Sequence, residues 1–143
     1  LRGWIGDVYD GCLRTPALVN WPGVLKPQIL DQVTSVLDWH PTLTALAKGQ
    51  VAAAARIEGR DIWPAISRGQ QLEPPTLYWC NSNGKRRAVR QHDWKLVVDT
   101  RTTMIELFDM KNDPYEKNNL AARHPDRVKQ LQKLLARQVA LDP

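Results

Sequence analysis

The opening stretch of the sequence gathers charged side chains among glycines, a pattern that loops carrying catalytic groups share. Its charged residues are Arg2, Asp7, Asp10 and Arg14, and its glycines are Gly3, Gly6 and Gly11. A short apolar run, residues 17–19, follows and ends at a Trp-Pro-Gly turn. A charged, glycine-rich loop before an apolar run predicts a loop, a buried strand and a turn. Residues 1–23 are therefore the first candidate for catalytic machinery.

A second candidate is a cluster of basic residues in the middle of the chain. Its members are Lys85, Arg86, Arg87 and Arg90. On a strand, Arg86, Ala88 and Arg90 would share one face. That face is either a solvated side of a sheet or a contact surface for an anionic ligand or a neighbouring domain. Because no recognised nucleic-acid motif accompanies the charges, we do not expect a nucleic-acid partner.

The remaining reactive residues form no complete catalytic or metal-binding set. His40, His92 and His124 lie in separate segments without ligand spacing. The sequence has no Walker or Rossmann phosphate loop, no HExxH motif and no serine in a nucleophile elbow. Cys12 and Cys80 match no metal spacing. They could pair, although two free, buried thiols are the favoured interpretation.

Length and composition indicate one ordinary domain, or the end of a larger protein. The chain has 143 residues, of which 43% are hydrophobic and 24% charged, the balance of a globular protein. No apolar run approaches the roughly 20 residues of a membrane helix, so a membrane partner is not expected. The net charge of +5 is compatible with an anionic substrate.

The elements that would position these residues fall into two parts. In the first part, Asp38 is expected to cap a helix that holds Pro41 in its first turn. Residues 59–70 predict a short helix or turn, and the alanine-rich residues 50–59 predict a linker. Residues 70–75, which end in two prolines, are the strongest boundary signal in the chain.

In the second part, the sequence pattern is typical of β-strands. Four runs rich in β-branched and aromatic residues predict an antiparallel meander. They are residues 76–80, 86–91, 94–99 and 103–109. Asn83-Gly84 is the predicted turn of the first hairpin, and His92-Asp93 that of the second.

A final amphipathic helix is expected to begin at Pro125, which suits the first helical position. Its apolar stripe comprises Val128, Leu131, Leu135 and Val139. Four strands and one helix make a small two-layer α+β unit.

Taken together, these segments resemble the C-terminal third of the type I, formylglycine-dependent sulfatase (arylsulfatase) family. The similar segments are residues 1–23 (family pattern LRGxKGxxYEGGxRxPxxxxWPG), 35–49 (SxxDxxPTLxxLAG), 59–66 (GxDxWPxL), 87–97 (VRxGxWKLV) and 106–125 (ELYDLxxDPxExxNLA). They occur in the family's order and cover nearly the whole chain. The second and the last segments resemble most the arylsulfatase B-like branch, which acts on sulfated amino sugars.

The resemblance implies an α/β, alkaline-phosphatase-like fold. Residues 1–72 would be the C-terminal end of the large α/β domain, and residues 73–143 the small domain with a four-stranded antiparallel sheet and a C-terminal helix. It also implies sulfate-ester hydrolysis by a formylglycine, made from a Cys or Ser in a CxPxR-type motif, with a calcium ion held by Asp and Asn oxygens. Calcium and formylglycine are expected in a complete family member, and this chain is expected to hold neither.

The sequence departs from the family's pattern at catalytic positions. Neither Cys12 nor Cys80 continues as CxPxR, so no residue corresponds to the formylglycine. Ile5 occupies the position of the lysine that binds the sulfate, and an isoleucine carries no charge. Asp10 and Arg14 keep the family's charge pattern and are expected to form a structural pair across the loop. The family's nucleophile, calcium ligands and active-site histidines lie upstream of the matched segments.

Residues 1–72 would offer a strand and a helix that are normally buried against a large sheet. Without that sheet they would expose an apolar surface. Its members would be Leu18, Val19, Leu43 and Leu46. We therefore expect the part after Pro75 to be the better-folded half.

The sequence thus predicts a C-terminal fragment of a sulfatase that acts on an aryl sulfate or a sulfated sugar and is inactive alone. One alternative is a non-catalytic module whose Arg86 and Arg90 bind an anionic glycan. Another is a phosphonate or phosphodiester hydrolase of the same superfamily. The expected partner is a sulfated small molecule or glycan, and the oligomeric state is not predicted. No signal-peptide pattern opens the sequence, although the family makes a periplasmic or secreted location an expectation.

Overall fold

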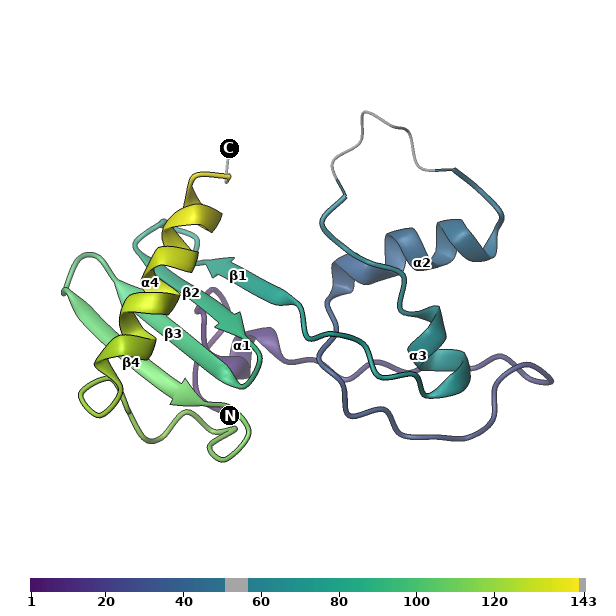
Figure 1. The fold of residues 1–143 in the computed structure, drawn as a ribbon, viewed down its shortest axis with the longest axis horizontal. Helices are drawn as coiled ribbons and strands as arrows, with labels where there is room; N and C mark the ends of the chain where they lie inside the picture. Colours follow the sequence, from purple (N-terminus) through teal and green to yellow (C-terminus); the bar gives the residue numbers. More distant parts are fainter. Residues whose placement is uncertain (51–56, 142–143) are drawn as a thin grey trace. The chain divides into compact units, whose positions relative to one another are not determined.

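The computed structural model describes residues 1–50 and 57–141, and the chain divides into two compact units (Figure 1). One unit joins Leu1–Pro16 to Thr76–Pro143, and the other is Ala17–Pro75. The charged N-terminal segment therefore folds with the C-terminal sheet, although residues 17–75 lie between them in the sequence. Most of the predicted alanine-rich linker lies outside the described residues. The assignment of residues 1–72 and 73–143 to the two sulfatase domains stays a prediction.

The predicted meander is confirmed almost residue for residue. Strands β1 (Thr76–Cys80), β2 (Arg86–Gln91), β3 (Trp94–Asp99) and β4 (Met104–Asp109) form one antiparallel sheet in the order β1-β2-β3-β4. The two predicted turns contain residues in the left-handed region, Gly84 with φ 73° and His92 with φ 53°. Tight hairpins require such conformations, which glycine adopts freely and histidine tolerates better than most residues.

Helix α4 (Pro125–Val139) crosses one face of this sheet (Figure 1). Its predicted stripe is confirmed, because Val128, Leu131 and Leu135 are buried and Val139 packs against the same cluster. The sheet contributes Val89, Leu96 and Leu107 to that cluster.

The segment between β4 and α4 protects the outer edge of β4. The side-chain oxygen of Asn119 accepts the backbone N–H of Leu107 at 3.1 Å. The Asn119 amide donates to the Ile105 carbonyl at 3.1 Å, and the backbone N–H of Leu120 donates to the Leu107 carbonyl at 2.8 Å. Unpaired strand edges invite association with other chains, so this cover keeps the sheet closed on that side.

The N-terminal segment, which contains the short helix α1 (Asp10–Leu13), covers the other face of the sheet. Val8 and Tyr9 pack with Ala88, Val97 and Phe108, and all five are buried. Side chains alternate along a strand, so Ala88 points to this segment while its neighbour Val89 points to α4. Of the two alternatives for this face of β2, the solvated side of a sheet is therefore excluded. This face is a second core, because residues that lie far away in sequence cover it.

The unit of residues 17–75 contains η1 (Val36–Asp38), α2 (Trp39–Leu46) and α3 (Trp63–Arg68). Asp38 does not cap α2 as predicted. Its carboxylate instead accepts the N–H of Ser35 at 2.8 Å, while the Ser35 hydroxyl accepts the N–H of Leu37 at 3.3 Å. This is a capping box that begins one short turn earlier.

The same Asp38 also joins two segments of this unit, those that begin at Ser35 and Gly59. Its other carboxylate oxygen accepts the N–H of Arg60 at 3.0 Å, and the Thr42 hydroxyl accepts the N–H of Ile62 at 2.9 Å. Gly59 passes so close to the Leu37 carbonyl that an added Cβ would collide with it. The segments that begin at Ser35 and Gly59 therefore fold as one piece.

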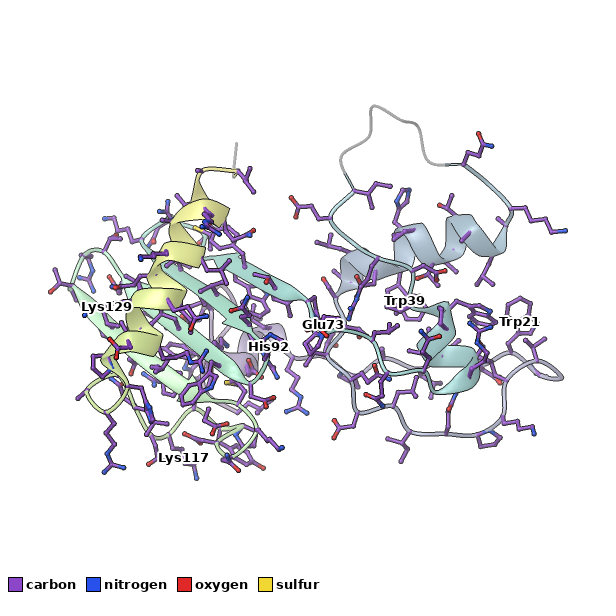
Figure 2. All side chains as sticks on the ribbon, in the orientation of Figure 1. Trp21, Trp39, Glu73, His92, Lys117 and Lys129 are labelled. Carbon is purple, nitrogen blue, oxygen red and sulfur yellow. The ribbon has the colours of Figure 1, made fainter. Side chains whose placement is uncertain are left out.

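The predicted buried strand at residues 17–19 does not form. These residues have no regular structure, Leu18 is 94% exposed and Val19 41% exposed. A lone apolar run gains strand structure only by pairing with neighbours, which the described residues do not supply. Trp21, further along, instead packs on Trp63 of α3 with ring centroids 5.5 Å apart (Figure 2). Within the described residues, no helix is long and apolar enough to cross a membrane.

Candidate functional site

The candidate site is the loop at residues 1–14, held on the sheet by its own charged side chains. The backbone closes on itself, because the N–H of Gly11 donates to the Arg2 carbonyl at 2.6 Å. Gly11 has to be glycine, since an added Cβ would collide with that carbonyl. The N–H of Asp7 donates to the Trp4 carbonyl at 3.0 Å, which forms a turn at the tip. Trp4 and Ile5 project from this turn, 86% and fully exposed.

A buried lysine anchors the end of the loop. The Lys95 ammonium lies 2.8 Å from the Asp10 carboxylate and 2.7 Å from that of Glu116, and both Lys95 and Glu116 have no exposed surface. The second carboxylate oxygen of Glu116 accepts the backbone N–H of Asp10 at 2.8 Å. The Trp79 ring covers the ammonium at 5.3 Å. Because buried charges are costly unless paired and hydrogen-bonded, this arrangement fixes Asp10 against β3.

An arginine on β2 binds the middle of the loop. The Arg86 guanidinium donates to the Asp7 carboxylate at 2.9 Å and to that of Asp99 at 3.1 Å. Asp99 also accepts the backbone N–H of Arg101 at 2.9 Å. Arg86 thus connects the loop to the end of β3 through two charge-assisted contacts, which are stronger than neutral hydrogen bonds.

A third group of polar contacts holds the start of the loop. Arg2 donates to the Glu106 carboxylate at 3.0 Å and to the Tyr9 hydroxyl at 3.1 Å. The Tyr9 hydroxyl in turn donates to the other oxygen of Glu106. The Arg2 guanidinium also lies over the Tyr9 ring, 4.0 Å from its centroid. Three of the loop's four charged residues, Arg2, Asp7 and Asp10, therefore each have a partner on the sheet side.

The electrostatics of the site follow from burial and pairing. Burial raises the pKa of Glu116, although Lys95 and the backbone of Asp10 oppose the shift. Burial and the contact with Glu106 raise the pKa of Tyr9, so its hydroxyl stays a donor. The hydrogen bond that Arg86 donates to the Asp7 carboxylate is the main cause of the raised pKa of Arg86. Burial alone would raise the pKa of Asp99, but hydrogen bonds from Arg101, Arg86 and Thr102 outweigh it and lower the pKa.

The predicted structural pair of Asp10 and Arg14 takes another form. The Asp10 carboxylate pairs with Lys95, and the described contacts join Arg14 to Asp10 only through its backbone N–H, which donates to the Asp10 carbonyl at 2.8 Å. The prediction was wrong about the partner, because a buried carboxylate needs a buried cation and the Arg14 side chain is exposed. The pairing of Asp10 with Lys95 joins the loop to β3.

The predicted anion-binding residues Arg86 and Arg90 do not share a site. Carboxylates of the chain itself, those of Asp7 and Asp99, already neutralise Arg86. Arg90 is partly buried and donates through Nε to the His92 carbonyl at 3.0 Å, and burial lowers the pKa of its guanidinium. No described geometry aims the two guanidinium groups at one ligand.

Calcium does not fit the described residues. Within residues 1–50 and 57–141 there is no group of three or more His, Cys, Asp and Glu side chains that could hold a metal ion. The carboxylates beside the loop all accept from cations, so they are not free to bind calcium. Cys12 and Cys80, both described, are free thiols; Cys80 is exposed and Cys12 half-buried, so the expected burial was wrong.

A comparison with protein families decides to which family this arrangement belongs. Residues 6–141 match the family model described as N-sulphoglucosamine sulphohydrolase, C-terminal. The chain belongs to the sulfatase family. The resemblance proposed from the sequence motifs is therefore confirmed.

Individual sulfatases give the same result. Arylsulfatase K of Gallus gallus is 28% identical over an alignment 142 residues long, which covers 90% of this chain and 26% of that protein. A sulfatase structure from a Bacteroides thetaiotaomicron locus for metabolism of multiple glycosaminoglycans has a TM-score of 0.68 at 25% identity, covering 81% of this chain and 27% of that one. The sheet and C-terminal helix thus have the fold of one part of the alkaline-phosphatase-like sulfatases. The chain spans about a quarter of the length of these relatives.

Sulfated sugars are substrates of related structures. One sulfatase, solved in complex with its substrate D-glucosamine-2-N,6-O-disulfate, shares the fold at a TM-score of 0.54 and 24% identity, covering 73% of this chain and 24% of that one.

The sulfatase motifs meet at one place in the structure. Arg2 and Asp10 come from the first motif, Lys95 from the WKLV motif, and Glu106 and Glu116 from the last motif. Sequence reasoning missed Lys95, Glu106 and Glu116 as site residues. Their signal was a charged residue on the inward face of a strand whose neighbours are apolar, as in Trp-Lys-Leu-Val-Val, since such residues are rarely buried unless paired.

Proposed function

We propose that this chain is the C-terminal part of a sulfate-ester hydrolase, in which it positions the loop of residues 1–14 beside a sulfated substrate. The observation that carries the proposal is the anchoring of that loop. Three separate ion-pair groups fix it to the sheet, while its tip at Trp4 and Ile5 stays free to meet another surface. A loop fixed at its base and exposed at its tip suits the presentation of residues to a ligand.

We further propose that the chain does not turn over sulfate esters by itself. Its carboxylates near the loop are paired with cations, and its two cysteines lie outside any formylglycine motif. The nucleophile and the metal would have to come from other residues of a longer protein. The isolated chain, incubated with 4-nitrophenyl sulfate and calcium, is expected to release no nitrophenol above the rate in buffer. Turnover proportional to chain concentration would overturn this proposal.

The contribution of the loop is testable in a chimera. This chain would replace the corresponding C-terminal part of an active arylsulfatase, and aryl sulfate hydrolysis would be followed. With Ile5 the chimera is expected to have a raised KM for the sulfate ester. Ile5→Lys should lower that KM roughly 10- to 100-fold, the size of one charge-assisted hydrogen bond. Trp4→Lys is the matched control, because it adds the same charge one residue away.

A chimera that folds but gains nothing from Ile5→Lys, or gains as much from Trp4→Lys, would show that position 5 does not face the sulfate. The substrate class that we propose for the complete protein is a sulfated small molecule or sulfated sugar.

A further inference from the structure

A groove opens on the α4 side of the sheet, on the face opposite to the anchored loop. It lies between the C-terminal half of α4 and the ends of β2 and β3, and its volume is about 300 Å³. Its apolar wall includes Val98, Leu135 and Ala136, and its polar groups are Arg87, Thr100 and Gln132. This volume lies at the small end of the range for ligand pockets.

Arg87 is the unusual member of this groove. Its register with Val98 and its neighbour Val89 place it on the α4 face of the sheet. Its Nε is buried and has no hydrogen-bond partner among the residues that the structure describes. Buried N–H groups nearly always have an acceptor, because an unmet one costs free energy.

The neighbouring Arg86 shows what Arg87 lacks. Arg86 faces the loop and is bound by two carboxylates, those of Asp7 and Asp99. No described carboxylate forms an ion pair with Arg87. Leu135, which lines the same groove, is a core residue of α4. Arg87 is therefore a cation with an unused N–H at the side of an apolar groove.

We propose that this groove binds a small organic anion, with its apolar body against Val98, Leu135 and Ala136 and its oxyanion head on the Arg87 guanidinium. A carboxylate, sulfate or sulfonate accepts in-plane N–H groups from arginine, and its charge complements the unpaired cation. The apolar wall favours a body of one or two rings over an inorganic ion. The site lies on the face of the sheet opposite to the loop, so this proposal does not depend on the proposed sulfatase function.

The test is a titration of the full chain with four probes. Two-dimensional NMR measures the chemical shifts of the backbone amides during each titration. The probes are naphthalene-2-sulfonate, 2-naphthoate, neutral 2-naphthol and inorganic sulfate. Both naphthalene anions are expected to shift the amides of Val98 and Ala136, with affinity about tenfold or more above that of 2-naphthol. Inorganic sulfate should shift them only weakly. Mapping by residue separates this groove from the exposed apolar residues of the other unit, such as Leu18 and Ile29.

Two variants and one control make the assignment specific. Arg87→Met keeps the length of the side chain and removes the head, so the advantage of the anions over 2-naphthol should disappear. Ala136→Phe fills the groove and should abolish binding of all the naphthalenes while Arg87 is still present. Arg101→Met removes a cation from the exposed turn after β3 and should change nothing.

Equal binding of 2-naphthol and the anions to the unaltered chain would overturn the proposal. So would an equal loss with Arg101→Met, or shifts confined to residues 17–50. A folded Arg87→Met chain that keeps the full preference for anions would show that another cation binds the head.

Discussion

The ammonium of Lys95 lies 2.7 Å from the carboxylate of Glu116, and water reaches neither side chain. Glu116 holds this position in a left-handed backbone conformation, with φ 54°. A residue other than glycine adopts this conformation only where its surroundings compensate for the strain. Here the compensation is visible, because one carboxylate accepts from both Lys95 and the backbone of Asp10.

Replacement of Lys95 by methionine is expected to lower the free energy of unfolding by about 3–5 kcal/mol, because it leaves the carboxylates of Asp10 and Glu116 buried without a cation. Urea unfolding followed by tryptophan fluorescence would measure the loss. Lys129→Met is the control, since Lys129 lies 3.8 Å from Asp126 in a pair that is 74% and 97% exposed (Figure 2). Such surface pairs contribute little. Similar effects of the two replacements would contradict the buried anchor.

Tyr9→Phe removes the hydroxyl that donates to Glu106 and accepts from Arg2. Loss of this buried donor should cost about 1–3 kcal/mol, because one oxygen of Glu106 is left without its partner. Differential scanning calorimetry would report it as a lower Tm. Tyr115→Phe makes the same chemical change at a residue that is 54% exposed and should leave Tm nearly unchanged. A Tm that falls as much in Tyr115→Phe as in Tyr9→Phe would argue against a special role of the buried hydroxyl.

The lowered pKa of Asp99 predicts a loss of stability in acid. A carboxyl whose pKa is lower in the folded than in the unfolded chain stabilises the fold above its unfolded value of 3.8, and this contribution is lost as pH falls through the folded value. As the pH is lowered from 6 to 2, the free energy of unfolding should therefore fall more steeply for the unaltered chain than for Asp99→Asn. If the free energy of unfolding depends on pH in the same way in both chains, the contacts of Asp99 with Arg86 and Arg101 do not stabilise its charged form.

Limited proteolysis should open the unit of residues 17–75 first. Its residues Leu18 and Ile29 are 94% and 97% exposed, and the described residues of this unit contain no sheet. Trypsin is expected to cut after Lys48 or Arg68 before it cuts within β2 or β3, because cleavage requires locally unfolded backbone. Mass spectrometry of the first fragments would identify the sites. First cuts after Arg87 or Lys95 would mean that the sheet is the weaker half.

The sheet and the last helix could be predicted from the sequence because their signals are local. Asn83-Gly84 fixes the first hairpin, and the spacing of Val128, Leu131 and Leu135 gives the helix and its buried face. The periodicity of apolar residues and the residue types of a turn depend only on residues that are close in sequence. These elements could therefore be predicted without knowledge of distant contacts.

The site could be predicted only in part, because its contacts join the two ends of the chain. Arg2 pairs with Glu106 across 104 positions, and Asp10 with Lys95 across 85. Asp10 was recognised as a residue that holds the loop, but periodicity carries no information about such distant partners. The strand expected at residues 17–19 failed for a related physical reason, since a strand exists only beside a partner.

The order in which the chain is made adds a consequence to the pairing of its two ends. Tyr9 leaves the ribosome 97 residues before its partner Glu106, and Asp10 leaves it 106 residues before Glu116. The opening segment must therefore remain undocked while the inserted unit and the sheet are synthesised. Contacts so far apart in sequence pay the entropy of closing a long loop before they stabilise anything, and they slow folding. We expect the docking of residues 1–16 to be the last and slowest step in the maturation of this unit.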